Sequence, residues 1–167
     1  HPQQVIEIAT AGVDAMTEGR CILGLGASGP QVIEGWHGLT YDAPIGRTRE
    51  IIDICRLVWK RDEKLTYDGK YYKLSRANCD PKPLQTPHPP IWIGGGGEQL
   101  TLRVVATHAD YSNFGGQPAE WARKREILKG HCAAVGRDEE AIGKTWSPDY
   151  AAIARAYGVD GVKLASA

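Results

Sequence analysis

The sequence lacks the features that would indicate a nucleic acid partner, a membrane or an oxidising compartment. Lysine and arginine number 20 and are balanced by 20 aspartates and glutamates, so no charge excess favours a nucleic acid or an anionic membrane. No apolar run approaches the length of a membrane-spanning helix, and no signal peptide is visible. The four cysteines are widely spaced and form no C-x-x-C pair, as is typical of thiols in a reducing compartment. We therefore expect a cytoplasmic protein that binds neither nucleic acid nor membrane.

Common catalytic and metal-binding patterns are also missing. The sequence contains no Walker phosphate loop and no arrangement that indicates a Ser-His-Asp triad. The spacing of Cys79, His88, His131 and Cys132 matches no zinc pattern, so no metal site is expected. The chain has 167 residues, of which 42% are apolar, and this suffices for one domain, residues 1–167, with a hydrophobic core.

One stretch organises the chain. Residues 91–93 form an apolar run between turn residues, which predicts a strand that is covered on both faces. Four glycines follow, which allow positive φ and the close approach of a ligand to the main chain: Gly94, Gly95, Gly96 and Gly97. The pattern over residues 98–107 predicts a helix, whose first turn would direct free N–H groups at the glycines. This arrangement predicts an anion site, and a flexible linker is the alternative.

The remaining patterns predict an α/β fold with about five mainly parallel strands. The strands are expected to start near Arg20, Pro90, Ala109, Lys144 and Gly161. Helices alternate with them, which implies a parallel sheet with right-handed crossovers. Asp68 and Gly69 form the preferred two-residue turn of a β-hairpin, so one antiparallel excursion is expected over residues 65–72.

Further candidate ligands stand where predicted strands end. Ser28 follows the first strand, and Ser112, Asn113 and Gly115 end the strand that comes after the glycine loop. Parallel sheets place their ligands at the carboxyl edge, so these residues are predicted to bind a cofactor together with the four glycines. An ordinary polar turn is the alternative for each of them.

Glu34 and His37 are the candidates for acid–base chemistry. They stand three residues apart, which can place both side chains on one helical face. Because histidine titrates near neutral pH, the pair is predicted to act as catalytic acid and base. A solvated surface pair is the alternative.

Four segments carry a resemblance to a known family. They are TEGRCILGLG (17–26), ASGPQVIEGWHG (27–38), the proline-rich lead into the glycine loop (81–97) and residues 109–113. Together they resemble the bacterial luciferase-like family of oxidoreductases, particularly its deazaflavin-dependent (coenzyme F420) members. The resemblance implies a TIM-type (β/α) barrel and a glycine loop that receives the cofactor phosphate. It also implies hydride transfer between coenzyme F420, or alternatively FMN, and a small-molecule substrate.

The resemblance covers residues 1–146 and describes only part of a barrel. A complete TIM-type barrel needs about 250 residues, and the first strands of the family would precede His1. Residues 147–167 form a divergent helix-strand tail, which also resembles a short segment of thiamine-diphosphate enzymes. The chain is therefore either an oxidoreductase or a non-catalytic partial barrel, truncated or recombined, that keeps a phosphate loop. Its open sheet edges predict a homo-oligomer.

Overall fold

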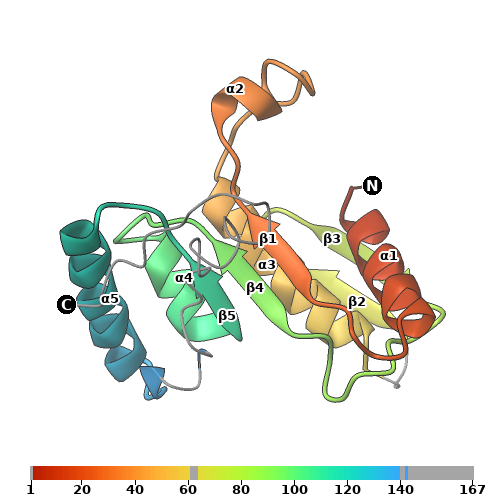
Figure 1. Ribbon diagram of the computed structural model, residues 1–167. Coiled ribbons are helices and arrows are strands. Elements are labelled where there is room, and N and C mark those ends of the chain that lie inside the picture. The colour runs from red at the N-terminus through yellow and green to blue at the C-terminus, as the bar shows by residue number, and fades with distance from the viewer. Residues whose placement is uncertain (1, 61–63, 140–141, 143–167) are drawn as a thin grey trace, which may run out of the picture.

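The computed structural model describes residues 2–60, 64–139 and 142. A three-stranded parallel sheet lies at its centre, in the order β1 (Leu23–Gly26), β4 (Ile91–Gly94) and β5 (Tyr111–Asn113) (Figure 1). The register places the last residues of the three strands side by side: Gly26, Gly94 and Asn113. The carboxyl ends of the strands therefore meet at one edge.

Four of the helices in the described part of the chain pack on one face of this sheet. They are α1 (Pro2–Met16), α3 (Pro44–Val58), α4 (Thr101–His108) and α5 (Pro118–Ala134) (Figure 1). Ile91 and Ile93 of the central strand are buried against the three later helices, whose contributions to this core include Ile52, Leu102, Val105 and Leu128. Leu23 of β1 joins a second cluster with Ala11, Cys55, Val58 and Trp59.

The alternate residues of the strands occupy the opposite face. Trp92 and Tyr111 lie side by side there, with ring centroids 5.5 Å apart. The indole Nε1 of Trp92 donates a hydrogen bond of 2.7 Å to Oδ1 of Asn113. Parallel strands with helices on one face and an inward aromatic layer on the other are the wall of a TIM-type barrel. The expected partial barrel is therefore confirmed.

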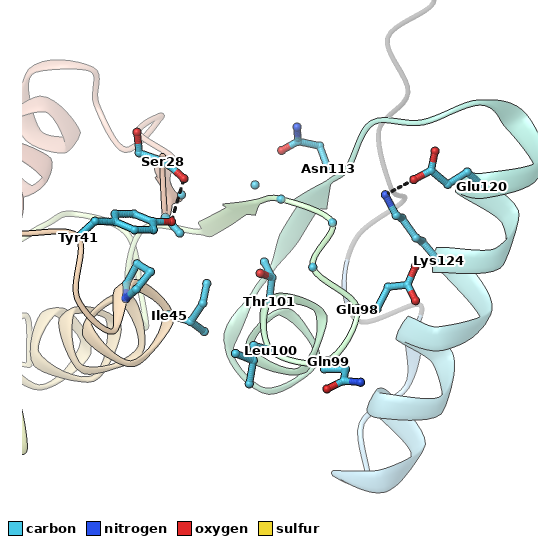
Figure 2. A pocket seen from close by; sticks show the side chains of 17 residues that line it. Ser28, Tyr41, Ile45, Glu98, Gln99, Leu100, Thr101, Asn113, Glu120 and Lys124 are labelled. Carbon is cyan, nitrogen blue, oxygen red and sulfur yellow. Dashed lines mark hydrogen bonds and ion pairs between the residues drawn. The ribbon is translucent and has the colours of Figure 1, made fainter. Parts of the chain in front are cut away.

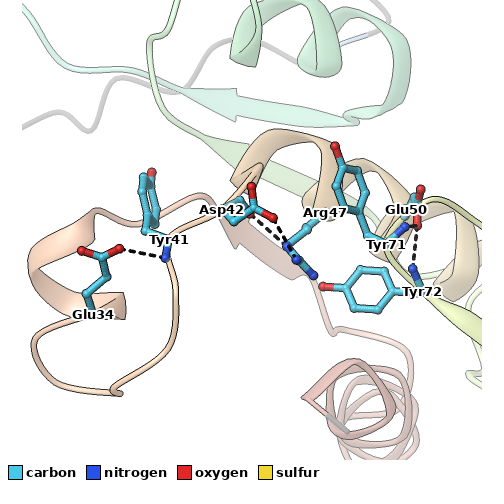
Figure 3. Close-up of polar contacts among 7 residues, drawn as sticks. All are labelled: Glu34, Tyr41, Asp42, Arg47, Glu50, Tyr71 and Tyr72. Carbon is cyan, nitrogen blue, oxygen red and sulfur yellow. Dashed lines mark hydrogen bonds and ion pairs between the residues drawn. The ribbon is translucent and has the colours of Figure 1, made fainter.

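The antiparallel excursion is present, but its turn differs from the prediction. The hairpin pairs β2 (Leu65–Asp68) with β3 (Lys73–Ala77), and Asp68 lies opposite Lys73. Four residues, 69–72, therefore form the loop, instead of the predicted two. The carboxylate of Glu50 on α3 holds this wider loop, because it accepts the N–H groups of residues 70, 71 and 72 at 2.8–3.0 Å. Figure 3 shows Glu50 beside Tyr71 and Tyr72.

Two predicted boundaries are wrong by a few residues. β1 starts at Leu23 and not near Arg20, because side chains bind the backbone of Cys21: its N–H donates to Asp14, and its carbonyl accepts from Gln85. α4 starts at Thr101 and not at Glu98, because the N–H of Leu102 reaches back to the carbonyl of Gly97 in a wide turn. The strands predicted near Lys144 and Gly161, with the tail 147–167, lie outside the described residues.

Helix α1 presents several of its apolar residues to the outside. Val5, Ile8, Val13 and Met16 recur at helical spacing, yet each is exposed, from 46% for Val13 to 85% for Met16. The buried face carries polar groups instead, among them Asp14, which accepts hydrogen bonds from the N–H groups of residues 84 and 85. None of the helices in the described part combines the length and apolar character needed to cross a membrane.

Candidate functional site

A cavity of about 1040 Å³ opens at the carboxyl edge of the sheet (Figure 2). Its walls are residues 26–28 after β1, residues 94–101 between β4 and α4, and Asn113 at the end of β5. Glu120 and Lys124 of α5 reach it from the far side. Ligands of parallel α/β proteins bind at this edge, where loops from different strands converge.

The floor of the cavity is main chain without side chains. A Cβ atom on Gly96 would lie 3.0 Å from Nζ of Lys124 and 3.1 Å from Cβ of Phe114, and one on Gly97 would lie 2.8 Å from Oγ1 of Thr101. Gly95 has φ of +123°, a backbone conformation that residues with a side chain rarely adopt. The four glycines therefore shape a cradle that side chains would fill.

The cradle offers backbone donors to a ligand. The N–H of Gly95 donates to the carbonyl of Asn113 at 2.9 Å and continues the sheet. For the next five residues, 96–100, no N–H group donates to an acceptor in the described part of the chain. These donors stand beside the amino end of α4, where the helix dipole adds partial positive charge. The cradle is therefore suited to an anion.

Lys124 supplies the positive charge that the glycine loop itself lacks. Its side chain is only 13% exposed, and its Nζ lies 2.7 Å from the carboxylate of Glu120 and 3.4 Å from the carbonyl of Gly115 (Figure 2). The acidic residue after the glycines, Glu98, is paired with Arg123 at 2.5 Å. The charge of Glu98 is therefore offset by Arg123, as that of Lys124 is by Glu120, and Lys124 is the one lysine or arginine among the residues that line the cavity.

Sequence reasoning missed Lys124, because no local pattern shows that the second turn of α5 faces the glycine loop. Two other cations, Lys82 and Arg103, which precede and follow the glycines in the sequence, do not line the cavity. Nζ of Lys82 donates to the carbonyl of Val58, and Arg103 lines a neighbouring cavity. A local signal does exist for the β1 side of the cavity: residues 24–29 have the spacing G-x-G-x-x-G, and residues 26–28 of this stretch line the cavity. The helix after it has only four residues, so it is no dinucleotide-binding unit.

The structure brings together most of the predicted cofactor ligands. Ser28 and Asn113 line the cavity with the four glycines. Ser28 has φ of +55°, and its carbonyl accepts a hydrogen bond of 3.1 Å from the hydroxyl of Tyr41. Ser112 is 1% exposed and pairs with Ile93 on the helix-covered face, and Gly115 is not among the lining residues. Strand alternation therefore separates Ser112 from its neighbour Asn113.

Glu34 and His37 lie outside the cavity. Both are exposed on the arm of residues 27–43, whose short helix α2 (Pro30–Ile33) stands away from the sheet (Figure 1). The carboxylate of Glu34 accepts the N–H of Tyr41 at 3.1 Å, which closes the arm on itself (Figure 3). No group of three or more His, Cys, Asp or Glu side chains within the described ranges is placed to hold a metal ion.

Fold and cavity together define an α/β-barrel segment with a glycine-lined cavity at the carboxyl edge of its sheet. The chain belongs to the luciferase-like monooxygenase family, whose sequence model matches residues 5–157. A Mycobacterium tuberculosis protein named as a coenzyme F420-dependent oxidoreductase is 51% identical over 67 residues, which are 40% of this chain and 19% of that protein. A phthiodiolone/phenolphthiodiolone dimycocerosates ketoreductase from a Mycobacterium species is 30% identical over 137 residues, 80% of this chain and 36% of that protein.

A solved structure shows the same fold. The coenzyme F420-dependent tetrahydromethanopterin reductase of Methanopyrus kandleri superposes with a TM-score of 0.75 at 18% identity. The match covers 84% of this chain and 44% of that protein. The chain thus spans less than half of the length of each of these three proteins.

Proposed function

We propose that this chain forms the phosphate-binding part of the cofactor pocket in a luciferase-like oxidoreductase. The cofactor is coenzyme F420, with FMN as the alternative, and the second substrate is a small organic molecule. One observation carries the proposal: the glycine cradle of residues 94–97 lies beside the amino end of α4 and Lys124. From residue 96 to residue 100, its N–H groups donate to no acceptor in the described part of the chain. Two of the similar proteins named above support the choice of F420, because their names describe them as F420-dependent.

The residues present fit a phosphate-bearing cofactor. Gly96, Gly97 and Lys124 would hold the phosphate, and Ser28 and Asn113 line the same cavity. The bound cofactor supplies hydride-transfer chemistry, while the protein provides binding and orientation. Trp92 and Tyr111 form an aromatic layer on that inner face, where parts of the barrel beyond this chain would complete the pocket.

The acid–base role of Glu34 and His37 remains a prediction. Both side chains are exposed on the arm, and the first residues of the arm, Ala27 and Ser28, line the cavity. A catalytic role requires the arm to bend over the cavity once a cofactor and a substrate are bound. Replacing His37 with alanine should then lower kcat of the active enzyme and leave the affinity for the cofactor unchanged.

Paired ligands test the phosphate site. The purified chain is titrated with FMN and riboflavin, and with coenzyme F420 and its phosphate-free deazaflavin core, while the fluorescence of the ring is followed. The phosphate-bearing member of each pair should bind at least about tenfold more tightly, as expected for one good charge-assisted contact. Equal affinities within both pairs, or no binding of any of the four, would refute the proposal.

The second candidate is a non-catalytic partial barrel that self-associates. The exposed apolar stripe of α1, which comprises Val5, Ile8, Val13 and Met16, favours it, because such a stripe marks an interaction surface. A symmetric pair of chains would cover both copies of the stripe. Light scattering should then show a dimer or larger species, and Val5→Glu with Val13→Glu should give monomers. A monomer of the unmodified chain at tens of micromolar, about the range of modest interfaces, would rule this out.

A further inference from the structure

Helix α5 contacts the loop after the glycines at two points, and both involve Glu98. The carboxylate of Glu98 forms an ion pair with Arg123, and its main-chain carbonyl accepts a hydrogen bond of 2.8 Å from Nε2 of His131. The Arg123 side chain is 59% exposed, so the ion pair contributes little. The bond from His131 is partly buried and reaches the main chain itself. His131 is therefore the residue of α5 that can fix the conformation of this loop.

The spacing along α5 brings His131 to the cradle. His131 follows Lys124 by seven residues, about two helical turns, so the two side chains lie on the same side of the helix. Leu128 lies between them on that side and is buried in the core that α5 shares with α4. A single helix, anchored by Leu128, thus places Lys124 beside Gly96 and His131 beside Glu98.

The hydrogen bond determines both the proton position on the ring and the direction of one peptide group. A carbonyl oxygen only accepts, so Nε2 of His131 must carry a proton. In a planar trans peptide, the N–H of Gln99 points opposite to the carbonyl of Glu98. This N–H is therefore directed away from His131, and it is one of those that donate to no acceptor in the described part of the chain. Gln99 itself lines the cavity.

The main chain around this peptide has few other restraints. After Gly95, the next main-chain N–H with an acceptor among the described residues is that of Leu102, which donates to the carbonyl of Gly97 at 2.9 Å. The intervening glycines give the backbone more conformational freedom than other residues would. Without the bond from His131, the ligand would have to order the loop as it binds, and this would lower its affinity.

We infer that His131 is a positioning residue of the phosphate site. Its hydrogen bond to Glu98 holds the loop of residues 96–100, before the ligand arrives, in the conformation that presents the free N–H groups. The inference rests on the proposed function and deepens it, because it names a residue outside the cavity lining that sets the affinity for the phosphate.

Two substitutions at residue 131 test the inference. In calorimetric titrations with inorganic phosphate and with FMN, well below the unfolding temperature, His131→Ala should raise Kd about fivefold to tenfold, the cost of ordering one more residue. His131→Gln should restore most of the affinity, because the amide Nε2 of glutamine donates at a similar reach. The control Arg125→Ala removes a hydrogen bond of 2.8 Å between α5 and Glu139 and should bind as the unmodified chain does. A general loss of stability would not give this pattern.

The outcomes separate this inference from the proposed function. If the unmodified chain binds both ligands and His131→Ala binds them equally well, the inference is wrong while the phosphate site stands. The same holds if His131→Gln is as weak as His131→Ala, or if Arg125→Ala weakens binding as much. If the unmodified chain binds neither ligand, the proposed function fails and the inference falls with it.

A measurement on the unmodified chain covers the case in which His131→Ala does not fold. Heteronuclear NMR of the imidazole ring should show a proton on Nε2 of His131 both in the free chain and with inorganic phosphate bound. An Nε2 without a proton in either state would overturn the inference, because the ring could not then donate to Glu98.

Discussion

Replacing Gly96 with alanine tests the cradle at its narrowest point. The new Cβ would lie 3.0 Å from Nζ of Lys124 and 3.1 Å from Cβ of Phe114. Phe114 is 7% exposed and packed in the core, so Lys124 must move instead. A bound phosphate then loses a charge-assisted contact worth about 1.5–3 kcal/mol, which corresponds to a ten- to hundredfold rise in Kd. The crowding against Phe114 should cost about 1 kcal/mol of folding free energy.

The assay is calorimetric titration with FMN and with inorganic phosphate, combined with thermal unfolding followed by circular dichroism. Gly130→Ala is the matched control, because a Cβ at this position of α5 meets no atom within 4 Å. The control should bind as the unmodified chain does and unfold at the same or a higher temperature. A Gly96→Ala protein that is folded and binds both ligands with unchanged Kd would show that the phosphate does not lie against residue 96.

Three further predictions follow from charges in the structure. Lys124→Met should weaken phosphate binding about tenfold and change the unfolding free energy by less than about 1 kcal/mol, since its partner Glu120 is 45% exposed; an unchanged Kd in the same titration would contradict this. Burial alone would raise the pKa of Glu50, but its three backbone hydrogen bonds outweigh burial and hold the pKa below 4.5. Urea unfolding should therefore show the free energy of unfolding falling as the pH drops below 4.5. Glu50→Ala should be about 3 kcal/mol less stable at neutral pH and should lack this pH dependence. Burial raises the pKa of Glu7 from 4.5 to about 7, so its contribution to the free energy of unfolding is complete below pH 4.5 and is lost as the pH rises through about 7. Relative to Glu7→Gln, the unmodified chain should lose about 3 kcal/mol of unfolding free energy between about pH 4.5 and 8. Parallel pH profiles of the two proteins would disprove this prediction.

Local sequence was sufficient to predict the parts of the fold that depend on local geometry. The strand at residues 91–93 and the glycines after it were recognisable because an apolar run and a positive-φ loop have direct signatures. The same holds for the hairpin as an element. The predicted length of its turn was wrong, because the loop is held by Glu50, which lies on α3 and is distant from the hairpin in the sequence. Tertiary hydrogen bonds therefore overrode the local preference of Asp68 and Gly69.

The candidate site was predictable only where main chain forms it. The glycines, Ser28 and Asn113 follow strands, and strand ends share an edge in any parallel sheet. Lys124 was not predictable, since the packing of α5 against α4 brings it to the cradle. The choice of which face of α1 is buried was not predictable either, because burial of a helix face depends on the surrounding structure. Here Glu7 and Asp14 are buried, whereas Val5 and Met16 are exposed.

The register that places Gly26, Gly94 and Asn113 side by side couples ligand binding to folding. These residues are far apart in the sequence and become neighbours only when the parallel sheet has formed, so the unfolded chain contains no binding site. A ligand must then stabilise the native state by mass action, by about 2.7 kcal/mol at a concentration one hundred times its Kd. The midpoint of thermal unfolding thereby becomes a binding assay that requires neither turnover nor a chromophore.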